Sequence, residues 1–218
     1  MRNPWLDIPL DDYEGHMAWP QVAQARLLAD VFKGMLEQHR PRSVAVLGCA
    51  GGNGLEGITA DVTERVVAVD INPVYVERLR ARYKARIPGL EICVADIQTM
   101  EAAFRPVELV FAGLVLEYVD VGAVLQRVRS SLVAGGVLRT VVQLPHPAAA
   151  AVTESPFPSV RALAAVMRLV PPLQLRDLAG RHGYTEIESR AEECPGGKQF
   201  QVQTFRKQTA TTAVTSNG

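Results

Sequence analysis

The stretch VAVLGCAGGNG, from Val44 to Gly54, runs from an apolar segment straight into a glycine-rich turn. A short apolar run of this kind is typical of a strand buried on both faces of a parallel sheet. The glycines let the backbone approach a ligand closely, and we expect the turn to lead into a helix at about residues 53–60. Unpaired amides at the start of such a helix favour an anionic group, such as a carboxylate or a phosphate. The stretch therefore predicts a ligand site at the end of the first strand.

Apolar runs and helical patterns alternate along the rest of the chain. Strands are expected at residues 43–47, 65–70, 90–94, 107–112, 137–144, 185–189 and 200–206, and helices at 20–39, 53–60, 74–87, 121–132 and 173–182. Asn72 is the expected N-cap of the helix 74–87, with Pro73 in its first turn. The alternation predicts a doubly wound, mostly parallel α/β sheet of seven strands. The last two strands have no helix between them, which favours a C-terminal antiparallel hairpin.

The length of 218 residues suits one α/β domain with small appendages. We expect an arm and a helix over residues 1–40 that cover the ligand site, with residues 1–19 irregular. The main domain is expected over 41–207, with a proline-punctuated lid insertion around 145–172. The polar segment 208–218 is predicted to be a disordered tail.

Composition excludes several classes of partner. Lys plus Arg equals Asp plus Glu at 23 each, so overall charge favours neither nucleic acid nor a membrane surface. A basic run on the helix 74–87 is interpreted as a solvated helix face, with RNA contact as the alternative. The three cysteines have no metal-ligand spacing, so no metal site is expected, and they fit a reducing, cytoplasmic location. No secretory signal is recognised, and no apolar run approaches the roughly 20 residues of a membrane span.

Acidic residues follow the second and third predicted strands where each strand ends. In an open α/β sheet, ligands bind beyond the carboxyl ends of the strands. The carboxylate of Asp70 can accept two hydrogen bonds from a vicinal diol, and Ile71 beside it offers an apolar face. The next strand ends in the same way, with Asp96 and Ile97, where an acid can accept from an exocyclic amine. These strand ends predict a site for a nucleoside that carries an amino-acid or phosphate tail.

Five segments in this order resemble the motifs of class I S-adenosylmethionine-dependent methyltransferases. They are VAVLGCAGGNGLE, VVAVDINPVYVERLRARY, CVADIQ, LVFAGLVLEYVD and SSLVAGGVLRTVV. Each segment is weakly specific alone, but together they cover residues 43–144 closely. The resemblance implies a Rossmann-like domain with S-adenosyl-L-methionine as the cofactor.

The resemblance also implies which residues bind this cofactor. The candidates lie in the arm, the glycine-rich turn and the following strand ends: Tyr13, Gly48, Cys49, Ala50, Gly52, Asn53, Asp70, Ile71, Asp96, Ile97 and Gly113. Val46 departs from the family, which often has an acid there to hold the methionine end. Asn53, Glu56 or the arm could compensate for it. Ala50 replaces a common glycine, which is a mild change if its φ is negative.

The methyl acceptor is expected to meet residues after the fourth and fifth strands. Glu117 and His146 are the candidate catalytic residues, since a neutral imidazole can act as a general base. His146 could equally be an exposed residue between two prolines. The candidate substrate-binding residues are His16, Trp19, Tyr118 and Gln143.

The family motif Asn/Asp-Pro-Pro-Tyr is absent, which argues against methylation of adenine N6 or glutamine. Neutral charge and the insertion favour a small-molecule methyl acceptor and a monomer or homodimer. Two alternatives remain at this point. The segment GNGLEG, residues 52–57, matches a dinucleotide-binding pattern, although it begins late after the strand. The missing acid at Val46 would also suit a protein that binds the cofactor without catalysis.

Overall fold

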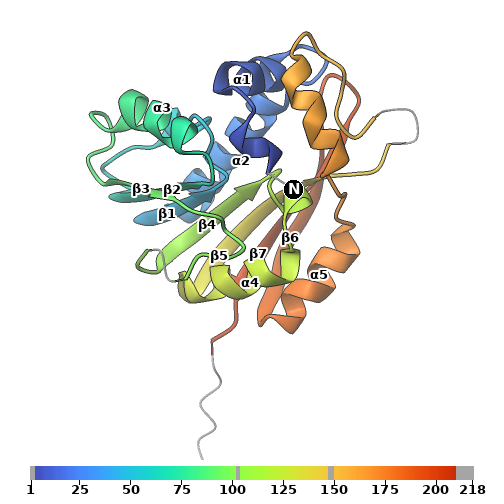
Figure 1. Cartoon of the computed structure of the whole chain (residues 1–218). Helices are drawn as coiled ribbons and strands as arrows, with labels where there is room; N and C mark the ends of the chain where they lie inside the picture. Colours follow the sequence, from blue (N-terminus) through green and yellow to red (C-terminus); the bar gives the residue numbers. More distant parts are fainter. Residues whose placement is uncertain (1–2, 102–103, 147–149, 210–218) are drawn as a thin grey trace, which may run out of the picture.

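One seven-stranded sheet forms the centre of the molecule (Figure 1). The computed structural model describes residues 3–101, 104–146 and 150–209. The strand order is β3-β2-β1-β4-β5-β7-β6; β7 runs antiparallel to its neighbours β5 and β6, and the other pairings are parallel. The strands are β1 (Ser43–Leu47), β2 (Arg65–Asp70), β3 (Leu90–Val94), β4 (Val107–Gly113), β5 (Leu132–Gln143), β6 (Tyr184–Glu193) and β7 (Gln199–Lys207). This arrangement confirms the predicted fold class, including the C-terminal antiparallel hairpin.

Helices cover both faces of the sheet. The α-helices are α1 (Leu10–Ala18), α2 (Gln24–His39), α3 (Pro73–Tyr83), α4 (Val121–Ser130) and α5 (Pro172–Arg181). Side chains of β1 alternate between the two faces: Val44 and Val46 pack in the same core as α2 and α3, and Leu47 packs with α4 and α5. Four short 3₁₀ segments complete the described elements: η1 (Pro4–Leu6), η2 (Leu55–Gly57), η3 (Leu116–Tyr118) and η4 (Pro158–Ala165). No helix in the described ranges is long and apolar enough to cross a membrane.

Two helix starts follow from capping residues. The side chain of Asn72 accepts a hydrogen bond from the Val74 amide at 2.9 Å, and Pro73 occupies the first turn of α3, as predicted. Asp120 caps α4 by accepting from the Ala123 amide at 2.8 Å.

Several expected elements are wrong in extent. Residues 1–19 are not an irregular arm, because their described part contains η1 and α1. The helix expected at 53–60 is reduced to the three-residue η2, whose N-cap, Gly54, has a φ of +90°. β5 begins at Leu132 instead of residue 137, because its pairing with β4 continues through a register shift and includes residues 134–136 in the strand. The predicted tail 208–218 lies largely outside the described residues.

The N-terminal segment and the 145–172 insertion pack against each other. Ile8 forms one apolar cluster with Val160 and Leu163 of η4. The hydroxyl of Ser159 lies 2.6 Å from an Asp12 carboxylate oxygen. Figure 1 shows α1 beside the orange segment that contains η4, above the carboxyl ends of the central strands. β1 lies between β2 and β4, so the strand order reverses there, where ligands bind in open α/β sheets.

Candidate functional site

Three adjoining cavities lie at this reversal point. The strand-end cavity, of about 630 Å³, lies over the carboxyl ends of β1 to β4. The glycine-loop cavity, of about 940 Å³, lies between the turn after β1 and helices α1 to α3. The α1 cavity, of about 440 Å³, lies between α1, the insertion and the residues around Gln143 and Lys198. Tyr13 lines all three cavities, so they adjoin one another at this residue.

Asp70 is the best-ordered polar group of the strand-end cavity. Its side chain is buried, and its two carboxylate oxygens accept from the amides of Ala50 and Asn72, each at 2.9 Å. Burial raises the pKa of this carboxyl, while the amide hydrogen bonds lower it in part. A carboxylate offers about four lone-pair positions, so both oxygens can still accept from a ligand. The carboxylate is therefore held in place and can receive two hydroxyl donors.

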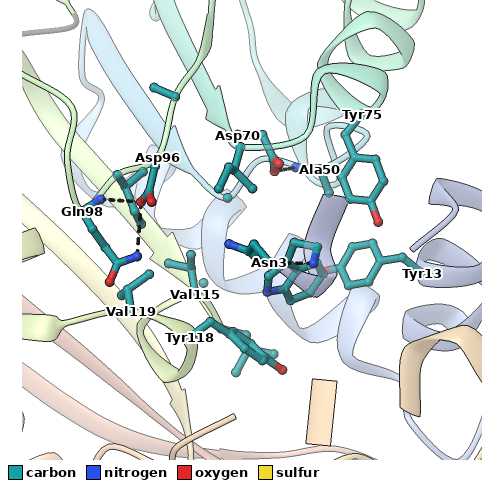
Figure 2. Close-up of a pocket in the computed structure, with 17 residues that line it drawn as sticks. Asn3, Tyr13, Ala50, Asp70, Tyr75, Asp96, Gln98, Val115, Tyr118 and Val119 are labelled. Carbon is teal, nitrogen blue, oxygen red and sulfur yellow. Dashed lines mark hydrogen bonds between the residues drawn. The ribbon is translucent and has the colours of Figure 1, made fainter. Parts of the chain in front are cut away.

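Asp96 lies along the same side of the cavity as Asp70, and Tyr118 lies across from them (Figure 2). One carboxylate oxygen of Asp96 accepts from the Gln98 amide at 2.9 Å. Ile71 and Ile97, which follow the two acids in sequence, also line the cavity. The structure thus brings together the two acid–isoleucine pairs that the sequence predicted at separate strand ends.

The turn after β1 holds its shape through positive φ angles. Gly48 has a φ of +66°, and an added Cβ would lie 2.9 Å from the Val115 side chain. Gly52 has a φ of +93° and packs beneath the ring of Tyr83, which an added Cβ would approach to 2.6 Å. Ala50 has a φ of +44°, so the condition for a mild change from glycine is not met and this residue is strained. The expected helix start is also wrong, and only the η2 turn follows the loop.

The glycine-loop cavity contains an ion pair. Arg82 of α3 binds Glu14 of α1 through two hydrogen bonds and donates a third to the Gly51 carbonyl at 3.1 Å. The basic run on α3 thus includes an arginine that lines a cavity. Val46 lines the same cavity and is 8% exposed, so its side chain offers only apolar contact.

Two further predicted residues lie in this cavity. Asn53 lines it, but its amide group donates to the Ala25 carbonyl at 2.8 Å and ties the loop to α2. Burial raises the pKa of the Cys49 thiol, which makes it a poor nucleophile. Gly113 lies between this cavity and the strand-end cavity and lines both.

Aromatic rings separate the strand-end cavity from the α1 cavity. Trp5 meets Tyr13 edge-on at 5.4 Å and Tyr118 edge-on at 5.0 Å between ring centroids. Tyr13 stacks on Tyr75 at 6.2 Å. Burial raises the pKa of Tyr13 and Tyr118, so both hydroxyls stay protonated. Tyr13 was predicted from the sequence, whereas Trp5 and Tyr75 were not.

The α1 cavity gathers polar groups from distant segments. The Nδ1 atom of His16 lies 2.8 Å from the Ser155 hydroxyl. Lys198 donates to the Ala151 carbonyl at 2.7 Å and to the side-chain oxygen of Gln143 at 3.4 Å. His16 and Gln143 were predicted as substrate-binding residues, and both line this cavity. Lys198 was missed, because its sequence context in a polar turn carries no signal.

Burial controls the charge of these groups. It lowers the pKa of Lys198 to about 8, so the amine is still protonated at neutral pH. Burial and the nearby Lys198 charge lower the pKa of His16. The imidazole is therefore neutral at pH 7 and can accept a proton. The cavity combines a cation with a neutral base.

Four predicted residues are not among the described residues that line these cavities: Gly52, Trp19, Glu117 and His146. His146 is exposed beyond the end of β5, and Trp19 lies at the C-terminal end of α1. Glu117 is buried, and its Oε1 accepts from the Gln143 amide at 2.7 Å while Oε2 has no hydrogen-bond partner. Burial raises the pKa of Glu117 to about 7. Its hydrogen bond is with the backbone amide of Gln143, which lines the α1 cavity.

Comparisons with known proteins agree with this architecture. Residues 44–136 match the family model described as a methyltransferase domain. No curated protein matches the sequence. The 1,6-didemethyltoxoflavin-N1-methyltransferase of Burkholderia thailandensis superposes with a TM-score of 0.67 at 18% identity, covering 91% of this chain and 84% of that one. The N-methyltransferase NodS of Bradyrhizobium japonicum WM9, in complex with S-adenosyl-L-homocysteine, gives 0.59 at 19% identity, with 95% and 93% covered.

A third similar structure is that of a cyclase. The [4+2]-cyclase SpnF gives a TM-score of 0.65 at 13% identity, covering 86% of this chain and 82% of that one. The fold is that of the class I S-adenosylmethionine-dependent methyltransferases.

Proposed function

We propose that this protein is an S-adenosylmethionine-dependent methyltransferase that acts on a small-molecule acceptor. The observation that carries the proposal is the position of Asp70 and Asp96 in one cavity that adjoins a second cavity lined by His16, Gln143 and Lys198. Nucleoside recognition and acceptor recognition then occupy neighbouring spaces, with Tyr13 at their junction.

The residues of the strand-end cavity fit the adenosine part of the cofactor. The fixed carboxylate of Asp70 can accept from the two ribose hydroxyls, and Ile71 and Ile97 offer apolar surfaces to the purine. Asp96 can accept from the exocyclic amine of adenine.

The methionine end fits the glycine-loop cavity despite Val46. This end carries an ammonium and a carboxylate, and Glu14 and Arg82 present the two opposite charges. We infer that this pair replaces the acid that the family often has at the position of Val46.

The protein's part in the reaction is to orient, to exclude water and to accept a proton. When bound, the cofactor would supply a methyl group activated on a sulfonium: a lone pair of the acceptor would form a bond to the methyl carbon as the carbon–sulfur bond breaks, and S-adenosylhomocysteine would leave. Trp5, Tyr13 and Tyr118 shield the junction of the cavities from solvent. His16 lines the α1 cavity as a neutral imidazole and can accept a proton from the acceptor. Positioning of this kind requires no fixed catalytic motif.

A small acceptor is supported by the lining of the α1 cavity. Side chains of α1, the insertion and the β6–β7 turn, among them His16, Met167 and Lys198, bound a concave space, as is usual for small-molecule sites. The B. thailandensis methyltransferase structure contains bound 1,6-didemethyltoxoflavin, a small molecule, which supports the same class of acceptor. The expected cytoplasmic location and the monomer or homodimer remain predictions.

The alternatives differ in their support. A cofactor-binding protein without methyl transfer is favoured by Val46 and by the similarity to a cyclase of this fold. A nicotinamide-dependent oxidoreductase is disfavoured, because the pattern in residues 52–57 leads into the three-residue η2 instead of the helix that such a site requires.

A thermal-shift panel with S-adenosylmethionine, S-adenosylhomocysteine, NAD and NADP tests the proposal. A ligand that binds only the native state raises the melting temperature. We expect both sulfur compounds to raise it and both nicotinamide nucleotides to leave it unchanged. Stabilisation by the nicotinamide nucleotides alone would refute the proposal. Formation of S-adenosylhomocysteine with an acceptor then separates an enzyme from a binding protein.

A further inference from the structure

The α1 cavity contains a buried cation whose presence the methyltransferase fold does not explain. We propose that this cavity binds the carboxylate of an acidic methyl acceptor, with Lys198 as the cation that recognises it. The inference rests on the proposed function and adds the chemical class of the substrate.

Lys198 is held by neutral groups. It lies in the turn between β6 and β7 and is 4% exposed. The two hydrogen bonds of its ammonium go to the Ala151 carbonyl and the Gln143 amide oxygen. In the parts of the chain that the structure describes, no carboxylate forms an ion pair with it. Because an unpaired buried charge is costly, a ligand that brings the opposite charge is strongly favoured here.

Two acidic residues that adjoin lining residues in the sequence do not fill this role. Glu154 is exposed and is not among the described lining residues of the cavity. Glu117 binds the backbone amide of Gln143, and its raised pKa of about 7 keeps much of it neutral at pH 7. The cavity therefore has a net positive character.

A second polar group points to an incoming ligand. The hydroxyl of Thr153 is buried without a hydrogen-bond partner, and Thr153 lines the α1 cavity. Native proteins leave few buried polar atoms unsatisfied, so such an atom in a cavity wall indicates a missing partner. A carboxylate can accept from the Lys198 ammonium and the Thr153 hydroxyl together, since its two oxygens offer several lone pairs.

The rest of the wall indicates an apolar body behind the acid group. Met17, Leu163 and Met167 line the cavity, and thioether side chains adapt to ligands of varied shape. The rings of Trp5 and Tyr118 close the side toward the strand-end cavity. The α1 cavity thus has one charged end and one apolar end, and an aromatic or cyclic aliphatic carboxylic acid is complementary to both.

Calorimetry on the full chain at pH 7, with saturating S-adenosylhomocysteine, tests the inference. The probes are three acids with their neutral amides: benzoate and benzamide, phenylacetate and phenylacetamide, cyclohexanecarboxylate and its carboxamide. We expect at least one acid to bind about tenfold more tightly than its amide, as for a hydrogen bond to a charged group. If no acid binds more tightly than its amide, the inference is wrong.

Two variants assign the preference to Lys198. Lys198→Gln should abolish the preference for the acid, whereas Lys33→Gln should retain it, because Lys33 is a surface residue of α2. A preference that survives in Lys198→Gln would overturn the assignment. The acid–amide comparison on the wild-type chain decides the inference even if Lys198→Gln does not fold. Binding of S-adenosylhomocysteine in the first step is the separate test of the proposed function.

Discussion

The strand-end cavity and the α1 cavity adjoin, yet they are built in different ways. The polar groups of the first follow successive strands, and Asp70 reaches back only to the Ala50 amide, 20 residues away. The second depends on contacts between distant segments: His16 meets Ser155 across 139 residues, and Lys198 meets Gln143 across 55. Sheet topology thus determines one half of the site, while packing of the insertion on the N-terminal segment determines the other.

Each half also has a buried carboxyl group, and the two carboxyl groups differ in how completely they are hydrogen-bonded. Asp70 has both oxygens bound to backbone amides, whereas Glu117, beneath the α1 cavity, has one oxygen without a partner. The polar groups around the strand-end cavity are therefore already held in place for a ligand, whereas the part of the site around the α1 cavity contains polar groups without hydrogen-bond partners. Four predictions test this contrast.

The largest expected effect is a pH dependence of stability that Glu117 causes. Its pKa is about 7 in the folded state against 4.5 in the unfolded state. Between these values the folded state retains a proton that the unfolded state has lost, so stability is full below pH 4.5 and falls as pH rises through 7. Glu117→Gln, which still accepts from the Gln143 amide, should gain up to about 3 kcal/mol relative to wild type across this window. Urea unfolding at a series of pH values measures the difference.

An exposed glutamate provides the control for this experiment. Glu77→Gln on α3 removes a carboxylate that pairs only with Arg80 at the surface. It should leave the pH dependence unchanged. If the free energy of unfolding of Glu117→Gln changes with pH in parallel with that of wild type, the pKa of Glu117 is not raised by folding.

The second prediction separates the two halves by ligand binding. Asp70→Ala should weaken S-adenosylhomocysteine binding by about 1–3 kcal/mol, the cost of an unpaired polar group. Lys198→Gln should leave that affinity unchanged, since Lys198 lines only the α1 cavity among the three. Calorimetry on both variants, with Asp61→Ala in an exposed loop as the control, makes the comparison. Equal losses for Asp70→Ala and Lys198→Gln would contradict the division into halves.

The third prediction concerns Tyr13, at the junction of the three cavities. Tyr13 lines all three cavities and stacks on Tyr75, so Tyr13→Ala should weaken S-adenosylhomocysteine binding about tenfold. The same variant should also lose the preference for carboxylic acids over amides. Tyr13→Phe keeps the ring and isolates the contribution of the hydroxyl. If Tyr13→Ala affects only one kind of ligand, the cavities are not joined at this residue.

The contrast also explains what the sequence could predict. Asp70, Ile71 and Asp96 were identifiable because a strand pattern fixes where a strand ends, and parallel strands end at one edge of the sheet. Lys198 and Thr153 were not, because nothing local to them shows that the β6–β7 turn meets the insertion. His146 follows β5 as expected, but β5 ends at Gln143 and His146 is exposed. The helix expected after the glycine turn was wrong because positive φ angles at Gly52 and Gly54 interrupt it.

The smallest expected effect tests strain in the strand-end half. Ala50 has a φ of +44°, which costs an L-residue about 1–2 kcal/mol, partly offset by the entropy that glycine loses on folding. Ala50→Gly should therefore raise the free energy of unfolding by about 0.5–1 kcal/mol. Ala29→Gly in the regular helix α2 should lower it by about 1 kcal/mol. Loss of stability in both variants would show that Ala50 is not strained.

A crystal structure with bound S-adenosylhomocysteine tests the central claim most directly. We predict that the ribose hydroxyls lie on the Asp70 carboxylate, the adenine lies beside Ile71 and Ile97, and the sulfur faces the α1 cavity past Tyr13. A nucleoside bound outside the strand-end cavity, or a sulfur turned away from the α1 cavity, would contradict the account.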